Sequence, residues 1–335
     1  MKIIAYHVFD EERPQIESWS KAHGIDVVMT SDLLNTATVH KAQGFDGISI
    51  QQTEPITDPA VYKKLHDFGF RQLSTRTAGF DVIDLNEAAR NHLAVTNVPA
   101  YSPYAVAELA VAQALQLERH LPQFNARVAR QDFRWNGLIS REIRSLTVGI
   151  IGTGRIGATA AQLFHGLGAT VIGFDVYPNQ KLNDVLTYRE SVEAVLAEAD
   201  IVSLHTPLMP ATHHMINKDN LKLMKRDAFL INVARGALIN TVDLIDALEQ
   251  HWIAGAALDA FESEWFNNQD LSDQPFDEPL IKKLMAMPNV LLTPHIGFYT
   301  QTAVKNMVDI CLDSVVDILQ TGTSENRVDL SRKAN

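Results

Sequence analysis

Short β-rich runs alternate with amphipathic stretches along the first hundred residues of the chain. The amphipathic stretches, residues 11–23 and 61–68 among them, place apolar side chains at helical spacing. The β-rich runs lie at residues 3–8, 26–29, 47–50, 73–75 and 94–97. Strands that alternate with helices in this way predict a parallel sheet covered by helices.

A second series of the same kind follows a long helical pattern. Residues 104–131, rich in Ala, Leu and Gln, predict one long helix that bridges two domains. Further strands are predicted at residues 146–151, 201–204, 228–233, 255–258 and 290–293. We expect the last helix, residues 302–319, to return to the first domain. The sequence therefore predicts two α/β domains, one made of residues 1–100 and 300–335 and the other of residues 101–299.

Composition narrows the class of protein. The chain of 335 residues has a net charge of −11, from 29 basic and 40 acidic side chains, and no basic cluster interrupts this balance. We therefore expect neither nucleic acid nor a membrane as a partner. No apolar run approaches the roughly 20 residues of a membrane span or resembles a signal peptide, so we expect a cytoplasmic protein. The single cysteine, Cys311, lies in an amphipathic stretch and is expected to be buried and structural.

Three glycines and an acid form the most informative motif. Gly152, Gly154 and Gly157 follow an apolar strand and precede a helix-compatible stretch, and Asp175 ends the next strand 18 residues after Gly157. In a dinucleotide site the first glycine permits a tight turn, the second lets the backbone approach a pyrophosphate, and the third lets the helix lie close to the sheet. The acid binds the adenosine ribose and repels a 2′-phosphate, so the motif favours NAD over NADP. The alternative is a glycine-rich turn in an ordinary βαβ unit.

Charged residues follow three later strands of the same predicted sheet. Arg235 and Gly236 end one strand, Glu262 and Glu264 follow another, and His295 follows a third. Ligands of open α/β sheets bind at the carboxyl edge, where an Arg can bind a carboxylate in two places. A Glu–His pair would favour the imidazolium form and keep a proton available near neutral pH. Each of these residues could instead have a structural or surface role.

Metal binding is not expected. The adjacent pair His213–His214 would diverge on a regular element, and no metal-ligand spacing such as H-E-x-x-H or C-x-x-C occurs. His205 follows a strand and is expected to line the cofactor cleft rather than to bind a metal.

These segments, in this order, resemble the D-isomer-specific 2-hydroxyacid dehydrogenase family over essentially the whole chain. The stretch from Thr147 to Gly157 is similar to the family's cofactor loop, Asn232 to Gly236 to its catalytic arginine strand, and Thr293-Pro-His295 to its acid/base histidine. The tracts at residues 97–103, 132–135, 141–144 and 298–300 look most like those of bacterial fermentative D-lactate dehydrogenases. The resemblance implies two doubly wound parallel-sheet domains: a Rossmann NAD domain and a smaller flavodoxin-like substrate domain formed by both chain ends.

The resemblance also assigns roles. It implies that Arg235 binds the substrate carboxylate and keto oxygen, that Glu264 pairs with His295, and that His295 donates the proton during reduction. Glu264 is preferred to Glu262 by its alignment from Asp259. The substrate-binding residues implied are Ala78 and Gly79, through their amides, and Tyr101, Phe298, Tyr299 and Gln51. The cofactor-binding residues implied are Gly152, Gly154, Arg155, Ile156, Gly157, Asp175, His205, Thr206, Pro207, Thr212, Val233, Ala234, Arg235 and Asp259.

Gln51 departs from the family pattern and leaves the substrate open. Lactate-type members align an aromatic residue there and isocaproate-type members an aliphatic one, and one such position can change preference by about 10–200-fold. The resemblance implies an NAD-dependent enzyme that reduces pyruvate to D-lactate, with a D-2-hydroxyisocaproate or other D-2-hydroxyacid dehydrogenase as the alternative. A catalytically silent NAD-sensing protein is the alternative from another class. The helical pattern at residues 104–131 and the tract at 132–144, with Trp135, resemble the family's dimerising segment and imply a homodimer.

Overall fold

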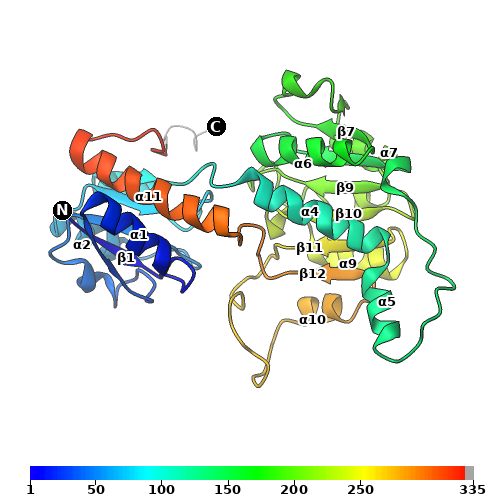
Figure 1. The fold of residues 1–335 in the computed structure, drawn as a ribbon, viewed down its shortest axis with the longest axis horizontal. Coiled ribbons are helices and arrows are strands. Elements are labelled where there is room, and N and C mark those ends of the chain that lie inside the picture. Colours follow the sequence, from blue (N-terminus) through cyan, green and yellow to red (C-terminus); the bar gives the residue numbers. More distant parts are fainter. Residues whose placement is uncertain (329–335) are drawn as a thin grey trace. The chain divides into compact units, whose positions relative to one another are not determined.

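The computed structural model describes residues 1–328 and divides the chain into two compact units. One unit contains Met1–Ser102 and the chain from Tyr299 onward, and the other contains Pro103–Phe298. Residues 329–335, which the sequence assigned to the first domain, lie outside the described residues. Figure 1 shows that both units are built of strands covered by helices, as the alternating pattern predicted.

The first unit contains a five-stranded parallel sheet in the order β2-β1-β3-β4-β5. This is the flavodoxin-like strand order. Its strands are β1 (Lys2–Tyr6), β2 (Asp26–Met29), β3 (Gly47–Ile50), β4 (Gln72–Thr75) and β5 (Ala94–Thr96). Its helices are α1 (Arg13–His23), the short η1 (Val39–Ala42), α2 (Pro59–Asp67), α3 (Leu85–Arg90) and α11 (Gln301–Thr321). All residues of β3 and β4 are buried, as expected of strands with helices on both faces.

Helix α11 joins the C-terminal part of the chain to the first unit. Its residues Val308, Leu312 and Val315 form one buried cluster with residues of β1 and α1, and Trp19 Nε1 donates a hydrogen bond to Asp313 at 2.8 Å. The predicted return of the last helix is therefore confirmed. Cys311 on this helix is buried, and burial raises the pKa of its thiol to about 11, so the thiol stays protonated and structural.

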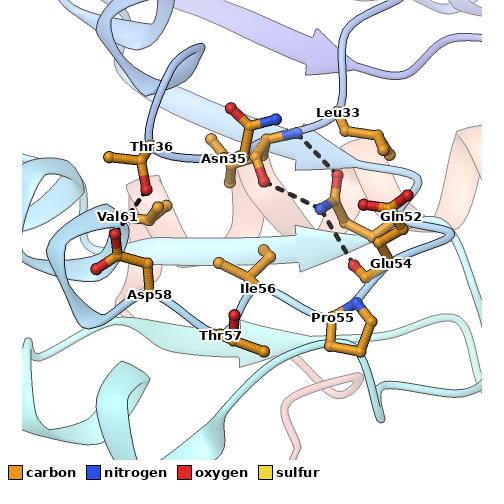
Figure 2. A pocket seen from close by; sticks show the side chains of 11 residues that line it. Leu33, Asn35, Thr36, Gln52, Glu54, Pro55, Ile56, Thr57, Asp58 and Val61 are labelled. Carbon is orange, nitrogen blue, oxygen red and sulfur yellow. Dashed lines mark hydrogen bonds between the residues drawn. The ribbon is translucent and has the colours of Figure 1, made fainter.

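A cavity of about 210 Å³ lies within the first unit, between the loop at residues 33–36 and the segment at residues 52–61. Figure 2 shows the Gln52 amide spanning from one to the other: its oxygen accepts from Leu34 N at 2.9 Å and its nitrogen donates to Leu34 O at 3.1 Å. None of the predicted substrate or cofactor residues lines this cavity. The Gln52 amide beside it is already paired with the backbone of Leu34.

The second unit contains a seven-stranded parallel sheet in the order β12-β11-β10-β9-β6-β7-β8. Six of these strands reproduce the Rossmann order, and β12 extends it by one. The strands are β6 (Thr147–Ile151), β7 (Thr170–Phe174), β8 (Thr187–Tyr188), β9 (Ile201–Leu204), β10 (Phe229–Asn232), β11 (Gly255–Leu258) and β12 (Val290–Leu292). The helices are α4 (Pro103–Glu118), α5 (Leu121–Val128), η2 (Ile143–Ser145), α6 (Arg155–Gly166), η3 (Gln180–Leu182), α7 (Val192–Glu198), α8 (Lys218–Leu221), η4 (Gly236–Leu238), α9 (Thr241–Glu249) and α10 (Pro279–Met285).

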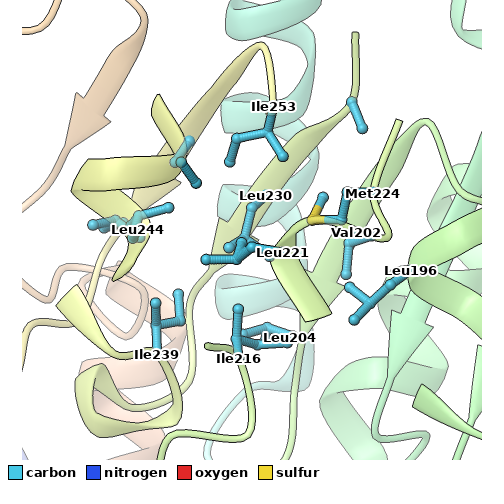
Figure 3. Close-up of a cluster of buried hydrophobic side chains, with 14 of the residues drawn as sticks. Leu196, Val202, Leu204, Ile216, Leu221, Met224, Leu230, Ile239, Leu244 and Ile253 are labelled. Atoms are coloured by element: carbon cyan, nitrogen blue, oxygen red, sulfur yellow. The ribbon is translucent and has the colours of Figure 1, made fainter. Parts of the chain in front are cut away.

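The core of this unit lies where the strands meet their covering helices. Figure 3 shows Val202 of β9 and Leu230 of β10 together with Leu196, Leu221 and Leu244, which come from three different helices. All five side chains are fully buried. Burying each leucine contributes about 1.5–3 kcal/mol, which fixes the sheet whose carboxyl edge carries the predicted site.

The predicted single helix at residues 104–131 is wrong, because α4 and α5 are separate helices. His120 adopts a left-handed backbone conformation with φ of 50°, and Pro122 occupies the first turn of α5. A proline lacks the amide proton that would continue a helix, so the chain turns at His120 and begins again. Downstream of α5, Phe133, Trp135 and Ile139 are exposed. Within residues 1–328, no helix is both long and apolar enough to span a membrane.

Candidate active site

The glycine loop between β6 and α6 has the shape that a dinucleotide site requires. Gly152 has φ of 91°, and a Cβ there would lie 2.8 Å from the backbone carbon of His205. A Cβ on Gly157 would lie 1.9 Å from the carbonyl oxygen of Gly152. A Cβ on Gly154 would meet nothing within 4 Å, and this residue leads directly into Arg155 and Ile156 at the N-terminus of α6. The loop is therefore tight where it packs and open at Gly154, which fits a pyrophosphate bound at the helix N-terminus.

Asp175 follows β7 and reaches back to this loop. One carboxylate oxygen accepts from the amide of Thr153 at 2.6 Å, and the other accepts from the amide of Tyr177 at 2.8 Å. The carboxylate is thus held beside the glycines, with both oxygens oriented by backbone donors. This is the arrangement expected of an acid that binds the ribose hydroxyls of NAD.

His205 and the loop after β9 form the next part of the cofactor side. Its Nε2 lies 2.9 Å from Ser203 Oγ, and its Nδ1 is buried without a hydrogen-bond partner among the described residues. Burial lowers the pKa of His205 to about 4, so the ring is neutral near neutral pH. The loop from Thr206 is closed by Thr212, whose hydroxyl donates to Pro207 O at 2.7 Å. These residues therefore form a neutral border beside Gly152.

The arginine strand ends in a compact turn. After β10, the Asn232 side chain accepts from Ala234 N at 3.1 Å and donates to Arg235 O at 2.9 Å, and Val233 between them is buried. A Cβ on the next residue, Gly236, would lie 1.8 Å from the backbone carbon of Phe261. The turn that carries Arg235 is therefore held against the segment that carries the acidic residues.

Glu264 and His295 form a hydrogen-bonded pair. His295 Nδ1 lies 2.9 Å from one Glu264 carboxylate oxygen, and the other oxygen accepts from Phe261 N at 2.9 Å. Burial by itself raises the pKa of Glu264, but the hydrogen bond and charge of His295 outweigh it and hold that pKa below its usual value. The ionised carboxylate accepts the hydrogen bond from Nδ1–H, which leaves Nε2 as the nitrogen that can transfer a proton.

Asp259 fixes the loop that carries His295. Its carboxylate accepts from the Thr293 hydroxyl at 2.6 Å and from the amides of Ile296 at 2.9 Å and Gly297 at 2.8 Å. The side chain is buried, and burial raises the pKa of Asp259 above its ordinary value. The sequence assigned Asp259 to the nicotinamide, and the structure adds that it shapes the histidine loop.

Glu262 has a different partner. One of its carboxylate oxygens lies 2.6 Å from His214 Nε2, and the other accepts from Thr241 N at 3.0 Å. The expectation that the side chains of His213 and His214 diverge is wrong: their ring centroids are 3.9 Å apart. His214 has φ of 50° and therefore does not lie on a regular element, which brings the rings together. No metal-binding group of acidic, cysteine or histidine side chains occurs within residues 1–328.

Three of the predicted substrate residues follow strands β3 and β4 of the first unit. Ala78 and Gly79 are in the loop after β4, where Asn97 Nδ2 donates to Ala78 O at 2.7 Å. Gln51 follows β3 and is buried, and its side-chain oxygen has no hydrogen-bond partner among the described residues. Asn306 donates to the carbonyl of Tyr101 at 2.6 Å. A hydrogen bond to Glu11 raises the pKa of Tyr299. Phe298 is the last residue of the second unit.

A buried ion pair next to this loop was not predicted. Arg76 Nε donates to Glu12 Oε1 at 2.7 Å, and the same guanidinium donates to Ser49 Oγ and Tyr6 O, both at 2.9 Å. Both charged side chains are almost fully buried. The pair ties α1, β1 and β3 to the backbone just before Ala78. The only hint in the sequence is an arginine that directly follows a buried strand.

Comparisons with known proteins show the family to which the chain belongs. A family model for the D-isomer specific 2-hydroxyacid dehydrogenase, NAD binding domain, matches residues 111–297. The chain belongs to this family. The D-2-hydroxyacid dehydrogenase (NAD(+)) of Clostridioides difficile is 50% identical over 331 residues, which cover 98% of this chain and 100% of the relative.

Two solved structures of the family extend the comparison. A D-lactate dehydrogenase from Sporolactobacillus is 53% identical with a TM-score of 0.86, covering 98% of this chain and 99% of that one. The D-lactate dehydrogenase of Lactobacillus jensenii, solved with NAD⁺, is 40% identical with a TM-score of 0.87, covering 98% and 100%. The protein is therefore an NAD-dependent D-2-hydroxyacid dehydrogenase, and the cofactor expected from Asp175 is confirmed.

Two contributors to this dehydrogenase site had no role in the sequence-based prediction. Asn232 closes the arginine turn, and Thr293 connects the histidine loop to Asp259. Both residues lie inside motifs that the sequence revealed. An Asn at a strand end commonly bonds to backbone two or three residues on, so this contact could have been anticipated.

Proposed function

We propose that this dehydrogenase reduces pyruvate to D-lactate, with His295 as the proton donor. The observation that carries the proposal is the 2.9 Å contact between Glu264 and His295 Nδ1, which holds the ring in the tautomer that acts from Nε2. NADH, when bound, supplies the hydride for C2 of the substrate. Pyruvate as the substrate is supported by the D-lactate dehydrogenases among the relatives, at 53% and 40% identity.

Residues of the second unit have distinct roles in the proposed reaction. The Arg235 guanidinium binds the substrate carboxylate bidentately and polarises the keto group, because a planar guanidinium matches a carboxylate. His295 gives its proton to the keto oxygen while C2 is reduced, and Glu264 stabilises the imidazolium before that step. The structure fixes the backbone of Arg235 through Asn232 and Gly236. Preorganisation of this kind reduces the cost of orienting the groups at each turnover.

NAD is held in this proposal by the glycine loop and its neighbours. The amides of Arg155 and Ile156 bind the pyrophosphate beside Gly154, and Asp175 binds the adenosine ribose. Thr206, Pro207 and Thr212 border the adenosine side, and Val233, Ala234 and Asp259 contact the nicotinamide. The roles of Ala78, Gly79, Tyr101, Phe298, Tyr299 and Gln51 in binding the 2-keto acid stay predictions, as does the cytoplasmic location.

A branched 2-keto acid is the second candidate substrate. Gln51 keeps it open, because it matches neither the aromatic side chain that lactate-type members align at this position nor the aliphatic one of isocaproate-type members. The C. difficile relative is named only for 2-hydroxyacids in general. One buried position can change preference by about 10–200-fold, so this residue could decide between the two substrates.

Parallel assays decide between the substrates. NADH oxidation is followed with pyruvate and with 2-ketoisocaproate, and the chirality of the product is determined with a stereospecific assay. The proposal predicts a higher kcat/KM for pyruvate and D-lactate as the product. A much higher kcat/KM for the branched acid would move the enzyme to the isocaproate type, and NADH binding without turnover would favour the NAD-sensing alternative.

We also propose a homodimer. Phe133, Trp135 and Ile139 are 72%, 78% and 94% exposed, which is unusual for apolar side chains so close in sequence. A second copy of the chain would bury them. Light scattering on the wild type and on Trp135→Ser tests this, because a monomeric wild type would exclude it.

A further inference from the structure

Glu264 lies in a long segment without regular secondary structure. The segment runs from the end of β11 at Leu258 to the start of α10 at Pro279. A residue in such a segment needs contacts from outside its own turn if it is to hold a fixed position. The hydrogen bond from Phe261 N to Glu264 lies within the turn, three residues away, and does not anchor the turn to the rest of the unit.

Glu278 supplies contacts of this kind on both sides of Glu264. Its Oε1 accepts a hydrogen bond from Ser263 Oγ at 2.8 Å and another from Trp265 Nε1 at 2.5 Å. Ser263 and Trp265 are the two sequence neighbours of Glu264. One carboxylate oxygen therefore connects the residues before and after the acid to the first turn of α10.

Helix capping does not account for this carboxylate. Glu278 is the N-cap residue of α10, yet its side chain accepts no capping hydrogen bond from the helix. The helix begins with Pro279, whose fixed φ favours a first helical turn. Removing the Glu278 carboxylate would therefore remove the contacts to Ser263 and Trp265. It would not remove a helix-capping hydrogen bond, because the side chain makes none.

Aromatic packing supports the same segment. The ring centroid of Phe266 lies 5.7 Å from that of Phe261 and 5.1 Å from that of Phe276, and Trp265 lies 6.1 Å from Phe276. This cluster holds the two ends of the segment together. The hydrogen bonds to Glu278 add directional contacts, because they hold the residues on either side of Glu264.

We propose that Glu278 is a positioning residue for proton transfer: by binding Ser263 and Trp265 it holds Glu264 at hydrogen-bond distance from His295. The inference rests on the proposed roles of Glu264 and His295. Since reduction requires protonated His295, activity falls as pH rises and the imidazolium loses its proton. A displaced Glu264 stabilises the imidazolium less, so this alkaline fall should begin at a lower pH.

Three single variants test the proposal through the pH profile of kcat/KM for pyruvate reduction. Glu278→Ala should lower kcat/KM by about tenfold and move the alkaline half-point to lower pH by about half a unit, with NADH affinity within about twofold of wild type. Glu278→Gln keeps an acceptor oxygen and should recover most of the activity and the original profile. Asp277→Ala removes the neighbouring exposed carboxylate and should match the wild type.

The outcomes separate positioning from a structural role. A lower melting temperature for Glu278→Ala with an unchanged pH profile would overturn the proposal, and so would equal losses in the Ala and Gln variants. If Glu278→Ala does not fold, the double variant Ser263→Ala/Trp265→Phe removes both donors and must shift the profile in the same direction. Glu264→Gln is assayed alongside: an unchanged profile there would reject the proposed role of Glu264 itself rather than that of Glu278.

Discussion

The carboxylates of Glu264 and Glu262 are two residues apart in sequence, yet they pair with different histidines. Glu264 lies 2.9 Å from His295 Nδ1, whereas Glu262 lies 2.6 Å from His214 Nε2. His295 follows β12, the neighbour of β11, and its loop is held by Asp259 at the end of β11, which accepts a hydrogen bond from Ile296 N. The chain therefore contains a proposed catalytic pair and a matched control pair within one segment.

This difference predicts contrasting pH profiles. The pKa of Glu264 is held below its usual value, so the group is ionised through the working range and places a negative charge beside His295 Nδ1. Glu264→Gln removes that charge, and the alkaline fall of pyruvate reduction should move to lower pH by about one unit, with kcat/KM reduced by about 10–100-fold. Glu262→Gln should keep the wild-type profile. Equal shifts in both variants would show that general charge, not pairing with His295, sets the profile.

Substitutions at different glycines of the cofactor loop should affect protein stability and NADH affinity separately. Gly157→Ala places a Cβ 1.9 Å from Gly152 O and should destabilise the protein by about 2 kcal/mol or more. Gly154→Ala meets open space, so it should fold like the wild type but bind NADH at least about tenfold more weakly. Gly166→Ala, also in open space on α6, should change neither property adversely. Thermal unfolding and NADH titration measure the two effects, and unchanged NADH affinity in Gly154→Ala would contradict the assigned phosphate site.

The buried pair Arg76–Glu12 predicts a stability effect in the substrate domain. Glu12→Gln leaves a buried guanidinium without its counter-charge and should lower the free energy of unfolding by about 3–5 kcal/mol. The exposed pair Lys63–Asp67 is the control, because Asp67→Asn should cost less than about 0.5 kcal/mol. Urea unfolding of both variants checks this. Similar losses of unfolding free energy in the two variants would mean that Arg76 is stabilised by its neutral hydrogen-bond partners alone.

The sequence predicted the parts of this enzyme that depend on local pattern. Buried strands such as β3 and β9 begin and end where the apolar runs do, and the strand-end position of His295 followed from the order of elements. The last helix extends one residue earlier and two later than expected, which changes nothing in its packing.

What the sequence could not predict depends on backbone turns and on contacts between distant residues. The left-handed conformation of His120 ends α4. The left-handed conformation of His214 brings the rings of His213 and His214 together. Nothing in the spacing distinguishes Glu262 from Glu264, because the turn at Phe261 decides which carboxylate faces His295. Glu12 and Arg76 are too far apart in sequence for their pairing to be read from a pattern.

A single-turnover experiment on His295→Ala tests whether His295 donates the proton. NADH binding is titrated first, and NADH oxidation is then followed after mixing the complex with pyruvate. NADH affinity should stay within about twofold of wild type and the turnover rate should fall by about 10²–10⁴-fold, because only the proton donor is lost. An unchanged turnover rate would show that His295 is not the proton donor.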